Sequence, residues 1–209
     1  MSLFEKLAQS VVIGNKCNRP LIIGYDDSLT LAGVGRSAFV FKIQHTNKVI
    51  KVFFPEHQHL AKEEAEVYKD IQHIDYYPVL YEVGMNYIVI DYIDGYTFFE
   101  CLTKGIEITE EEIKKVDLAL TLARKQGLNP SDIHLRNILI TSAKEIILID
   151  VARFRQLKTC NQWLDLKIAF YRFYTKRFFP KKIPAFILNC IAALYKFFHR
   201  KNIITGGIS

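Results

Sequence analysis

The sequence predicts an α+β fold with two lobes, a β-rich N-lobe followed by a reduced, largely helical C-lobe. Up to about residue 93, short runs rich in β-branched and aromatic residues alternate with turn residues, and one helical pattern interrupts them. After Asp94-Gly95, the apolar residues recur at helical spacing. We therefore expect one domain over residues 1–209, with an N-lobe at about 20–93 and a C-lobe at about 95–209.

The first elements are expected to be a short helix over residues 3–9 and then a hairpin. Its strands would be Leu21–Gly24 and Leu29–Leu31, joined by a turn at Asp26–Ser28. A second pair of strands follows, separated by a glycine turn that begins at Gly33.

That turn has two open interpretations. Because the residues after Gly35 are Phe-Val-Phe-Lys-Ile from Phe39 on, a strand follows the glycines, whereas a dinucleotide fingerprint requires a helix there. The pattern of a P-loop is also absent from the sequence. A flexible turn at this place can fold over the phosphates of a nucleotide, or it can be a glycine hairpin without a ligand.

Lys51 and Glu64 are the next candidate functional residues. Lys51 lies inside an apolar strand over residues 48–54, where it faces a cleft, a carboxylate or the solvent side of an edge strand. In a helix predicted over 57–73, Glu64 shares the apolar face with Val67, Tyr68 and Ile71. A carboxylate on an inward face needs a cation, so we expect Glu64 to pair with Lys51.

Two further strands, 79–83 and 87–93, complete the predicted N-lobe. Thr97 is expected to cap a helix over 98–103. Thr109 and Glu112 form a capping box for a helix that runs to about Gln126. Gly127 is its expected C-cap.

The stretch 127–150 gathers oxygen-bearing side chains around a short hairpin. Asp132 and Asn137 lie five residues apart in a loop, and Asp150 follows the second of the apolar runs 138–140 and 146–149. Carboxylate and amide oxygens suit Mg²⁺ and a hydroxyl nucleophile, as phosphoryl transfer requires. Taken alone, the spacing fits a plain hairpin with polar loop residues equally well.

After Asp150 the chain is basic and helical. This part holds 12 Lys/Arg and one acidic residue, Asp165, against 16 Lys/Arg and 21 Asp/Glu in residues 1–150. One helix is expected to bury a stripe of Leu166, Ala169, Phe170 and Phe173, and another is expected over Ala185–His199. We expect both to be buried helices of the C-lobe. The alternative is a basic, aromatic segment that meets an anionic partner, either a membrane surface or RNA.

Four scattered cysteines without metal-ligand spacing are typical of reduced thiols, and the N-terminus lacks the pattern of a secretory signal. The sequence therefore predicts a cytoplasmic protein, with peripheral membrane association left open by the basic C-terminal region.

Together, these motifs resemble the signature set of the protein-kinase-like superfamily, in the same order and over about residues 29–155. The resemblance is carried by Gly33-x-Gly35-x-x-Ala38-x-Val40, Val-Ile-Lys51, Glu64, Ile90–Ile93, Asp132-x-x-x-x-Asn137 and Asp150. In particular, the chain resembles small bacterial proteins described as probable serine/threonine-protein kinases.

The resemblance implies ATP and Mg²⁺ as cofactors and a role for each matched residue. Lys51, Glu64 and Asp132 would be catalytic, and Asn137 and Asp150 would hold the metal. The nucleotide would contact Lys51, the hinge residues Asp91 and Ile93, and the glycine-turn residues Gly33, Val34, Gly35, Arg36, Ser37, Ala38 and Val40.

The departures from the family pattern bear on regulation and substrate. Pro130-Ser131 replaces the His-Arg before the catalytic aspartate, so control by an activation-loop phosphate is not expected. Asp150-Val-Ala152 replaces Asp-Phe-Gly, which removes the glycine's flexibility. His134, two residues after Asp132, is common in small-molecule phosphotransferases of this fold.

Three functions therefore stay open. The chain is predicted to be a serine/threonine-protein kinase that transfers the γ-phosphate to an unidentified hydroxyl acceptor. The alternatives are a small-molecule or lipid-linked kinase of the same fold and a nucleotide-binding pseudokinase-like module.

Overall fold

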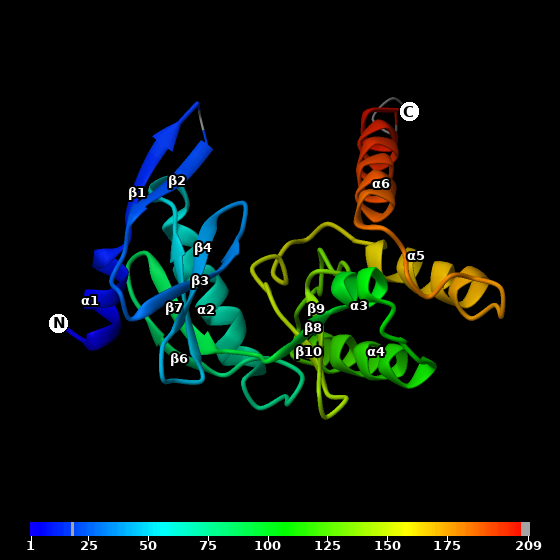
Figure 1. Cartoon of the computed structure of the whole chain (residues 1–209), viewed down its shortest axis with the longest axis horizontal. Helices are drawn as coiled ribbons and strands as arrows, with labels where there is room; N and C mark the ends of the chain where they lie inside the picture. The colour runs from blue at the N-terminus through cyan, green and yellow to red at the C-terminus, as the bar shows by residue number, and fades with distance from the viewer. Residues whose placement is uncertain (18, 206–209) are drawn as a thin grey trace.

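A computed structural model describes residues 1–17 and 19–205, with side chains described through Tyr195 and at Phe197. It has the predicted α+β fold: a β-rich lobe and a helical lobe joined by one extended connection (Figure 1). Residues 206–209 lie outside this description, and so do the basic side chains from Lys196 on, which include the basic end of the helix predicted over Ala185–His199.

The N-lobe is built on a five-stranded antiparallel sheet of order β3-β4-β5-β7-β6. Its strands are β3 (Leu29–Val34), β4 (Ala38–Ile43), β5 (Lys48–Phe53), β6 (Leu80–Val83) and β7 (Tyr87–Asp91). A separate pair, β1 (Val12–Lys16) and β2 (Arg19–Gly24), extends from the lobe (Figure 1).

Side chains alternate between the two faces of this sheet, as the period of a strand requires. Phe39, Phe41, Ile50 and Val52 pack in one core cluster with helix α1 (Leu3–Ser10). On β5, the residues between them, Val49, Lys51 and Phe53, face the other side. There, Val49 and Phe53 share a cluster with helix α2 (His59–Ile71), which follows the short helix η1 (Pro55–His57). The alternation thus places Lys51 on the face covered by α2.

The C-lobe begins with a three-stranded sheet and two helices. Strands β8 (Gly95–Thr97), β9 (Ile138–Thr141) and β10 (Ile146–Leu148) pair in the order β10-β9-β8. Thr97 and Thr109 cap the helices α3 (Phe98–Lys104) and α4 (Glu110–Lys125), as predicted. Both form complete capping boxes, although the box was predicted only at Thr109. Gly127 has a φ of 77°, which suits its predicted place at the end of α4.

The last elements are α5 (Gln162–Ala169), the π-helical turn η2 (Phe170–Tyr174) and α6 (Ala185–Thr205). Helix α6 projects from the edge of the C-lobe (Figure 1). No helix within the described residues is both long enough and apolar enough to span a membrane.

Several expectations about local structure are wrong. The predicted hairpin of 21–24 with 29–31 does not form, because β2 pairs with β1 and β3 pairs with β4. The strand at Val12–Lys16 was not predicted, so residues 21–24 were assigned to the next strand along the chain and not to their true partner. The break predicted at Asp94-Gly95 is confirmed for the five-stranded sheet, whose last strand ends at Asp91, but β8 of the C-lobe sheet, which begins at Gly95, was not predicted.

The predicted burial of the last helices is only partly confirmed. In the first of them, Phe170 is buried and Leu166 packs against the core, but Ala169 and Phe173 are exposed, while Trp163 and Tyr174 are buried. The wider π-helical turn at 170–174 rotates the buried side away from the face that a regular helix predicts. Within the described part of α6, Leu188 is the only buried large apolar residue, and Phe186, Ile187, Ile191, Leu194 and Phe197 are exposed.

Candidate active site

The glycine turn between β3 and β4 lies at the edge of the N-lobe that faces the C-lobe (Figure 1). The Gly35 amide donates to the Ala38 carbonyl at 2.9 Å, and a Cβ on Gly35 would approach the same carbonyl oxygen to 3.2 Å. A side chain at position 35 would therefore crowd this turn. Arg36 and Ser37 occupy the tip, Val34 is exposed before it, and Ala38 and Val40 return into the sheet.

Lys51 is the centre of a three-residue ion cluster. Its Nζ lies 2.7 Å from Glu64 Oε2 and 3.1 Å from Asp150 Oδ1. The Glu64 side chain is only 1% exposed and that of Lys51 12%. The predicted Lys51–Glu64 pair is thus present, and Asp150 joins it from the other lobe. A buried carboxylate requires such a partner, because an unpaired charge in this position is costly.

The charges in this cluster stabilise one another. Burial alone would lower the pKa of Lys51, but the carboxylates of Glu64 and Asp150 outweigh it and raise the pKa above its ordinary value. Burial likewise acts to raise the pKa of Asp150, yet the nearby Lys51 ammonium holds that pKa below the usual range. Lys51 and Asp150 therefore remain charged at neutral pH.

The loop before β9 brings Asp132 and Asn137 together. The Asn137 Nδ2 donates to the Asp132 carbonyl at 3.1 Å, and the Asn137 amide donates to the His134 carbonyl at 2.8 Å. The Ile149 amide in turn donates to the Asn137 carbonyl at 2.9 Å, which places Asp150 beside Asn137 in the fold. The side-chain Nδ2 of Asn137 is a donor and is engaged with the Asp132 carbonyl. The side-chain oxygen of Asn137 is the atom that can bind a cation.

Asp132 and Asp150 both adopt left-handed backbone conformations, with φ of 61° and 60°. Non-glycine residues seldom do so, and such positions cluster at functional sites. Aspartate tolerates this region better than most residues, but no pattern in the sequence marks these two positions in advance.

Arg36 provides a contact that the sequence did not reveal. Its Nη2 donates to Asp132 Oδ2 at 2.6 Å, and the Arg153 Nε lies 3.5 Å from the same oxygen. The tip of the glycine turn therefore reaches across to the loop of the C-lobe. Sequence reasoning placed Arg36 at the nucleotide but could not pair it with a residue 96 positions away.

The two hinge residues are placed differently from one another. The Asp91 carboxylate accepts from the Val79 amide and from the Tyr81 hydroxyl, both at 2.7 Å. Its side chain is thus engaged within the N-lobe, and a contact of Asp91 with adenine would involve its backbone. Ile93 lies in the connection between the lobes, partly buried.

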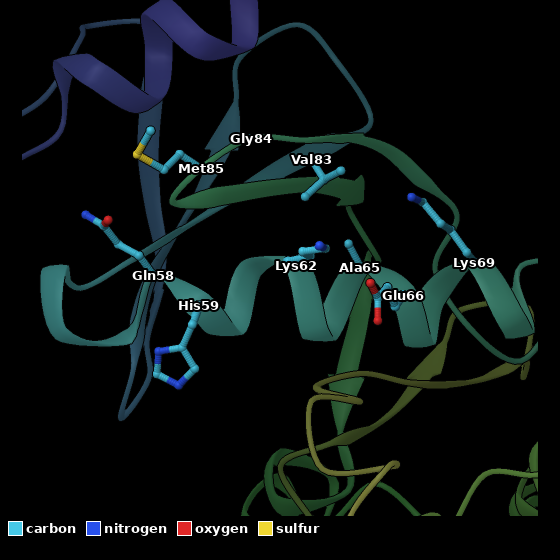
Figure 2. Close-up of a pocket in the computed structure, with 9 residues that line it drawn as sticks. All are labelled: Gln58, His59, Lys62, Ala65, Glu66, Lys69, Val83, Gly84 and Met85. Atoms are coloured by element: carbon cyan, nitrogen blue, oxygen red, sulfur yellow. The ribbon is translucent and has the colours of Figure 1, made fainter.

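Several cavities lie outside the ion cluster. One, of about 530 Å³, lies on the outer side of α2, where Lys62, Glu66 and Lys69 face Val83 and Met85 (Figure 2). A second, of about 270 Å³, lies between α5 and α6 and reaches His134. A third, of about 250 Å³, includes Trp163 in its lining. His134 is close enough to Asp132 and Asp150 to sense both charges, although burial dominates and lowers the pKa of His134.

Comparison with known proteins shows to which family the chain belongs. A protein from Bacillus subtilis (strain 168), "Putative serine/threonine-protein kinase YrzF", is 47% identical over 194 residues, which cover 92% of this chain and 90% of that protein. The chain belongs to the protein-kinase-like superfamily. The chain is therefore a kinase-like phosphotransferase.

No protein-family model matches the chain. A solved structure described as a co-crystal structure of WbdD and kinase inhibitor LY294002 aligns with a TM-score of 0.48 and 20% identity, over 69% of this chain and 37% of that one.

Proposed function

We propose that this kinase transfers the γ-phosphate of ATP to a serine or threonine hydroxyl of a protein, with Mg²⁺. The observation that carries the proposal is the ion cluster of Lys51, Glu64 and Asp150, which joins β5 and α2 of the N-lobe to the C-lobe. Protein kinases need a lysine–glutamate pair and a metal-binding aspartate in place at the same time. The name of the Bacillus subtilis relative also supports a serine/threonine acceptor.

Each residue of the N-lobe site has a role in holding ATP. Lys51 would bind the α- and β-phosphates, with Glu64 fixing its position. The backbone of Gly33–Val40 would cover the phosphates, and the connection at Asp91 and Ile93 would receive adenine.

Asn137 and Asp150 would hold Mg²⁺. Their donor set fits this ion, because Mg²⁺ in kinases takes one or two protein oxygens together with phosphate oxygens and water. Within the described residues, no group of three or more His, Cys, Asp or Glu side chains is placed to hold a metal without such help. When bound, the ion would neutralise charge that develops on the phosphates.

Asp132 would act on the acceptor. The acceptor oxygen forms a bond to the γ-phosphorus while the bond from that phosphorus to the β–γ bridging oxygen breaks, and ADP leaves. The hydroxyl proton passes to the Asp132 carboxylate. Positioning and charge neutralisation supply most of the rate enhancement in such a reaction, so few side chains are required.

The residue before Asp132 supports a site without a phosphorylation switch. Ser131 is fully buried, and its Oγ donates to the Asn129 carbonyl at 2.9 Å. An arginine in this position is what would receive an activation-loop phosphate. Ser131 lacks that charge, so we propose that the site is assembled without one.

Two variants test the assignment with separate readouts. We expect Mg²⁺-ATP to raise the melting temperature of the wild type and of Asp132→Asn, but not of Asp150→Ala. With labelled ATP and a pool of protein and small-molecule acceptors, only the wild type should transfer phosphate. Absence of a shift in the wild type would exclude nucleotide binding, and transfer by Asp132→Asn at the wild-type rate would exclude the role of Asp132.

The cavity beside His134 favours a second candidate, a kinase for a small or lipid-linked hydroxyl compound. Its walls are formed by the facing sides of α5 and α6. Helix α5 contributes Gln162, Asp165, Leu166 and Ala169, and helix α6 contributes Leu188, Asn189, Ile191, Ala192 and Tyr195. Phe99 forms part of its lining, and Arg136 lies over the Phe99 ring at 3.5 Å. A mostly apolar, partly enclosed space next to a catalytic loop suits the body of a small acceptor.

Adjacent alanines of α6 separate the two candidates. Ala192→Trp fills the cavity, whereas Ala193→Trp adds the same bulk at an exposed position outside the cavity lining. A small-molecule acceptor predicts that only Ala192→Trp abolishes transfer. Equal transfer by both variants to a protein acceptor would support the serine/threonine-protein kinase.

A further inference from the structure

The outward side of α6 is apolar, and within the described residues no other element covers it. Phe186, Cys190 and Leu194 follow one another at intervals of four residues, so they share one side of the helix. Phe186 is 67% exposed and Leu194 57%, and Cys190 is exposed as well. We call these three residues the α6 outer face.

The opposite side of α6 explains why the outer face is not needed for folding. Leu188 is buried, and Leu188, Ile191, Ala192 and Tyr195 line the cavity with α5. The Tyr195 hydroxyl donates to Asp165 Oδ2 at 2.7 Å, which anchors α6 to α5. A single anchored side is enough to place the helix, yet the outer face is as apolar as the anchored one.

Residues 185–195 contain no charged side chain. A surface helix of a soluble domain normally carries charged or polar residues opposite its core face. An amphipathic pattern is therefore missing here, and an exposed apolar stripe of this kind marks an interaction site.

The segment that leads into α6 carries exposed positive charge. Lys176, Arg177 and Lys182 are exposed, and within the described residues no carboxylate pairs with any of them. Phe178, between Arg177 and Phe179, is 95% exposed. Basic side chains flanking exposed aromatic and aliphatic ones are the pattern of a segment that lies in a lipid interface.

We propose that the α6 outer face and the segment 176–182 dock on an anionic lipid bilayer surface. Apolar side chains would enter the headgroup region, and Lys176, Arg177 and Lys182 would meet the lipid phosphates. Contact with RNA would use the same basic residues but would leave Phe186 and Leu194 without a function. The exposed apolar residues therefore select lipid between the two anionic partners that the sequence left open.

This docking would orient the kinase site. Helix α6 bears the outer face on one side and the cavity that reaches His134 on the other. A docked molecule thus holds that cavity close to the lipid surface. The proposal does not depend on phosphoryl transfer, since neither the outer face nor the basic segment contributes to the ion cluster.

Co-sedimentation of the full chain with vesicles tests the proposal. We expect the wild type to pellet with phosphatidylcholine vesicles that contain phosphatidylglycerol and to stay in solution with pure phosphatidylcholine. Phe186→Ser/Leu194→Ser should lose most of the binding. Each of Lys176→Gln, Arg177→Gln and Lys182→Gln should weaken partitioning roughly fivefold. Added salt should weaken it further.

Matched controls separate a local effect from misfolding. Met85→Ser/Leu157→Ser removes two apolar side chains elsewhere that are even more exposed than Phe186 and Leu194, and it should bind vesicles as the wild type does. In a second measurement, the emission of Leu194→Trp should shift to the blue on addition of anionic vesicles, whereas the native Trp163 is already buried.

Three results would overturn the proposal. These are equal pelleting with neutral and anionic vesicles, full binding by Phe186→Ser/Leu194→Ser, and an unchanged Leu194→Trp emission. A concentration-dependent dimer that is lost in Phe186→Ser/Leu194→Ser, from a wild type that does not bind vesicles, would instead assign the face to a second copy of the chain.

Discussion

Arg36 at the tip of the glycine turn donates a hydrogen bond to the carboxylate of Asp132 in the C-lobe, over 2.6 Å. Asp132 is the residue to which we assign the acceptor proton, so this contact occupies an oxygen that the acceptor hydroxyl needs. Arg36 is itself 65% exposed, which limits the strength of the pair through solvent screening. The contact is therefore a weak restraint that an incoming acceptor can displace.

Replacement of Arg36 by glutamine should release Asp132. An exposed ion pair contributes roughly 0.2–1 kcal/mol, so we expect the apparent KM for the acceptor to fall by up to about fivefold with little change in ATP binding. Steady-state kinetics over a range of acceptor concentrations measure this. Arg153→Gln, which removes the longer 3.5 Å contact, should have a smaller effect. A loss of kcat by orders of magnitude in Arg36→Gln would show instead that Arg36 acts on the transferring phosphate.

Much of the fold that surrounds the site was predictable because local sequence specifies it. The alternation of β5 and the helical spacing of α2 together predict that Lys51 and Glu64 face one another. The capping boxes at Thr97 and Thr109 mark their helices within a residue or two. These features depend on near neighbours in the chain, which a pattern can report.

The remainder depends on residues that are far apart in sequence. The pairing of the short strand β8 with β9 and the contact of Arg36 with Asp132 each join segments that are distant in the sequence. The exposure of Phe186 and Leu194 was mispredicted for a related reason. Apolar composition predicts burial, but whether another element covers a helix is set by the whole fold.

Loss of the capping box should destabilise α4 without touching the site. In Thr109→Ala, the Glu111 amide loses the Thr109 oxygen as an acceptor and Glu112 loses its hydroxyl donor. We expect the free energy of unfolding to fall by about 1 kcal/mol in urea titrations. Thr121→Ala, whose hydroxyl only bonds the Asp117 carbonyl within the same helix, is the control and should change stability much less. Equal effects of the two substitutions would contradict a special role for the cap.

Removal of Lys51 should destabilise the protein as well as inactivate it. Lys51→Met leaves the buried Glu64 carboxylate without its cation, which costs about 3–5 kcal/mol when one partner of a buried pair is lost. Lys51→Met/Glu64→Met should recover most of this stability while remaining inactive, because the isolated charge is then gone. Lys115→Met, which breaks the exposed pair with Glu111, should be nearly neutral. If the double variant were no more stable than Lys51→Met, the cost would lie in lost packing and not in the unpaired carboxylate.

Mild acid should weaken the folded protein through His134. Burial lowers the pKa of His134, and its Nδ1 accepts a hydrogen bond from the Arg136 amide, so the folded state favours the neutral ring. Because the unfolded chain then binds a proton more readily than the folded one, stability must fall as pH drops through the ordinary histidine value of about 6.5. Urea titrations at neutral and at mildly acidic pH should show this loss in the wild type and a smaller loss in His134→Gln. His59→Gln removes a histidine outside the site and is the control. An identical pH dependence in wild type and His134→Gln would mean that His134 is not the group that couples protonation to folding.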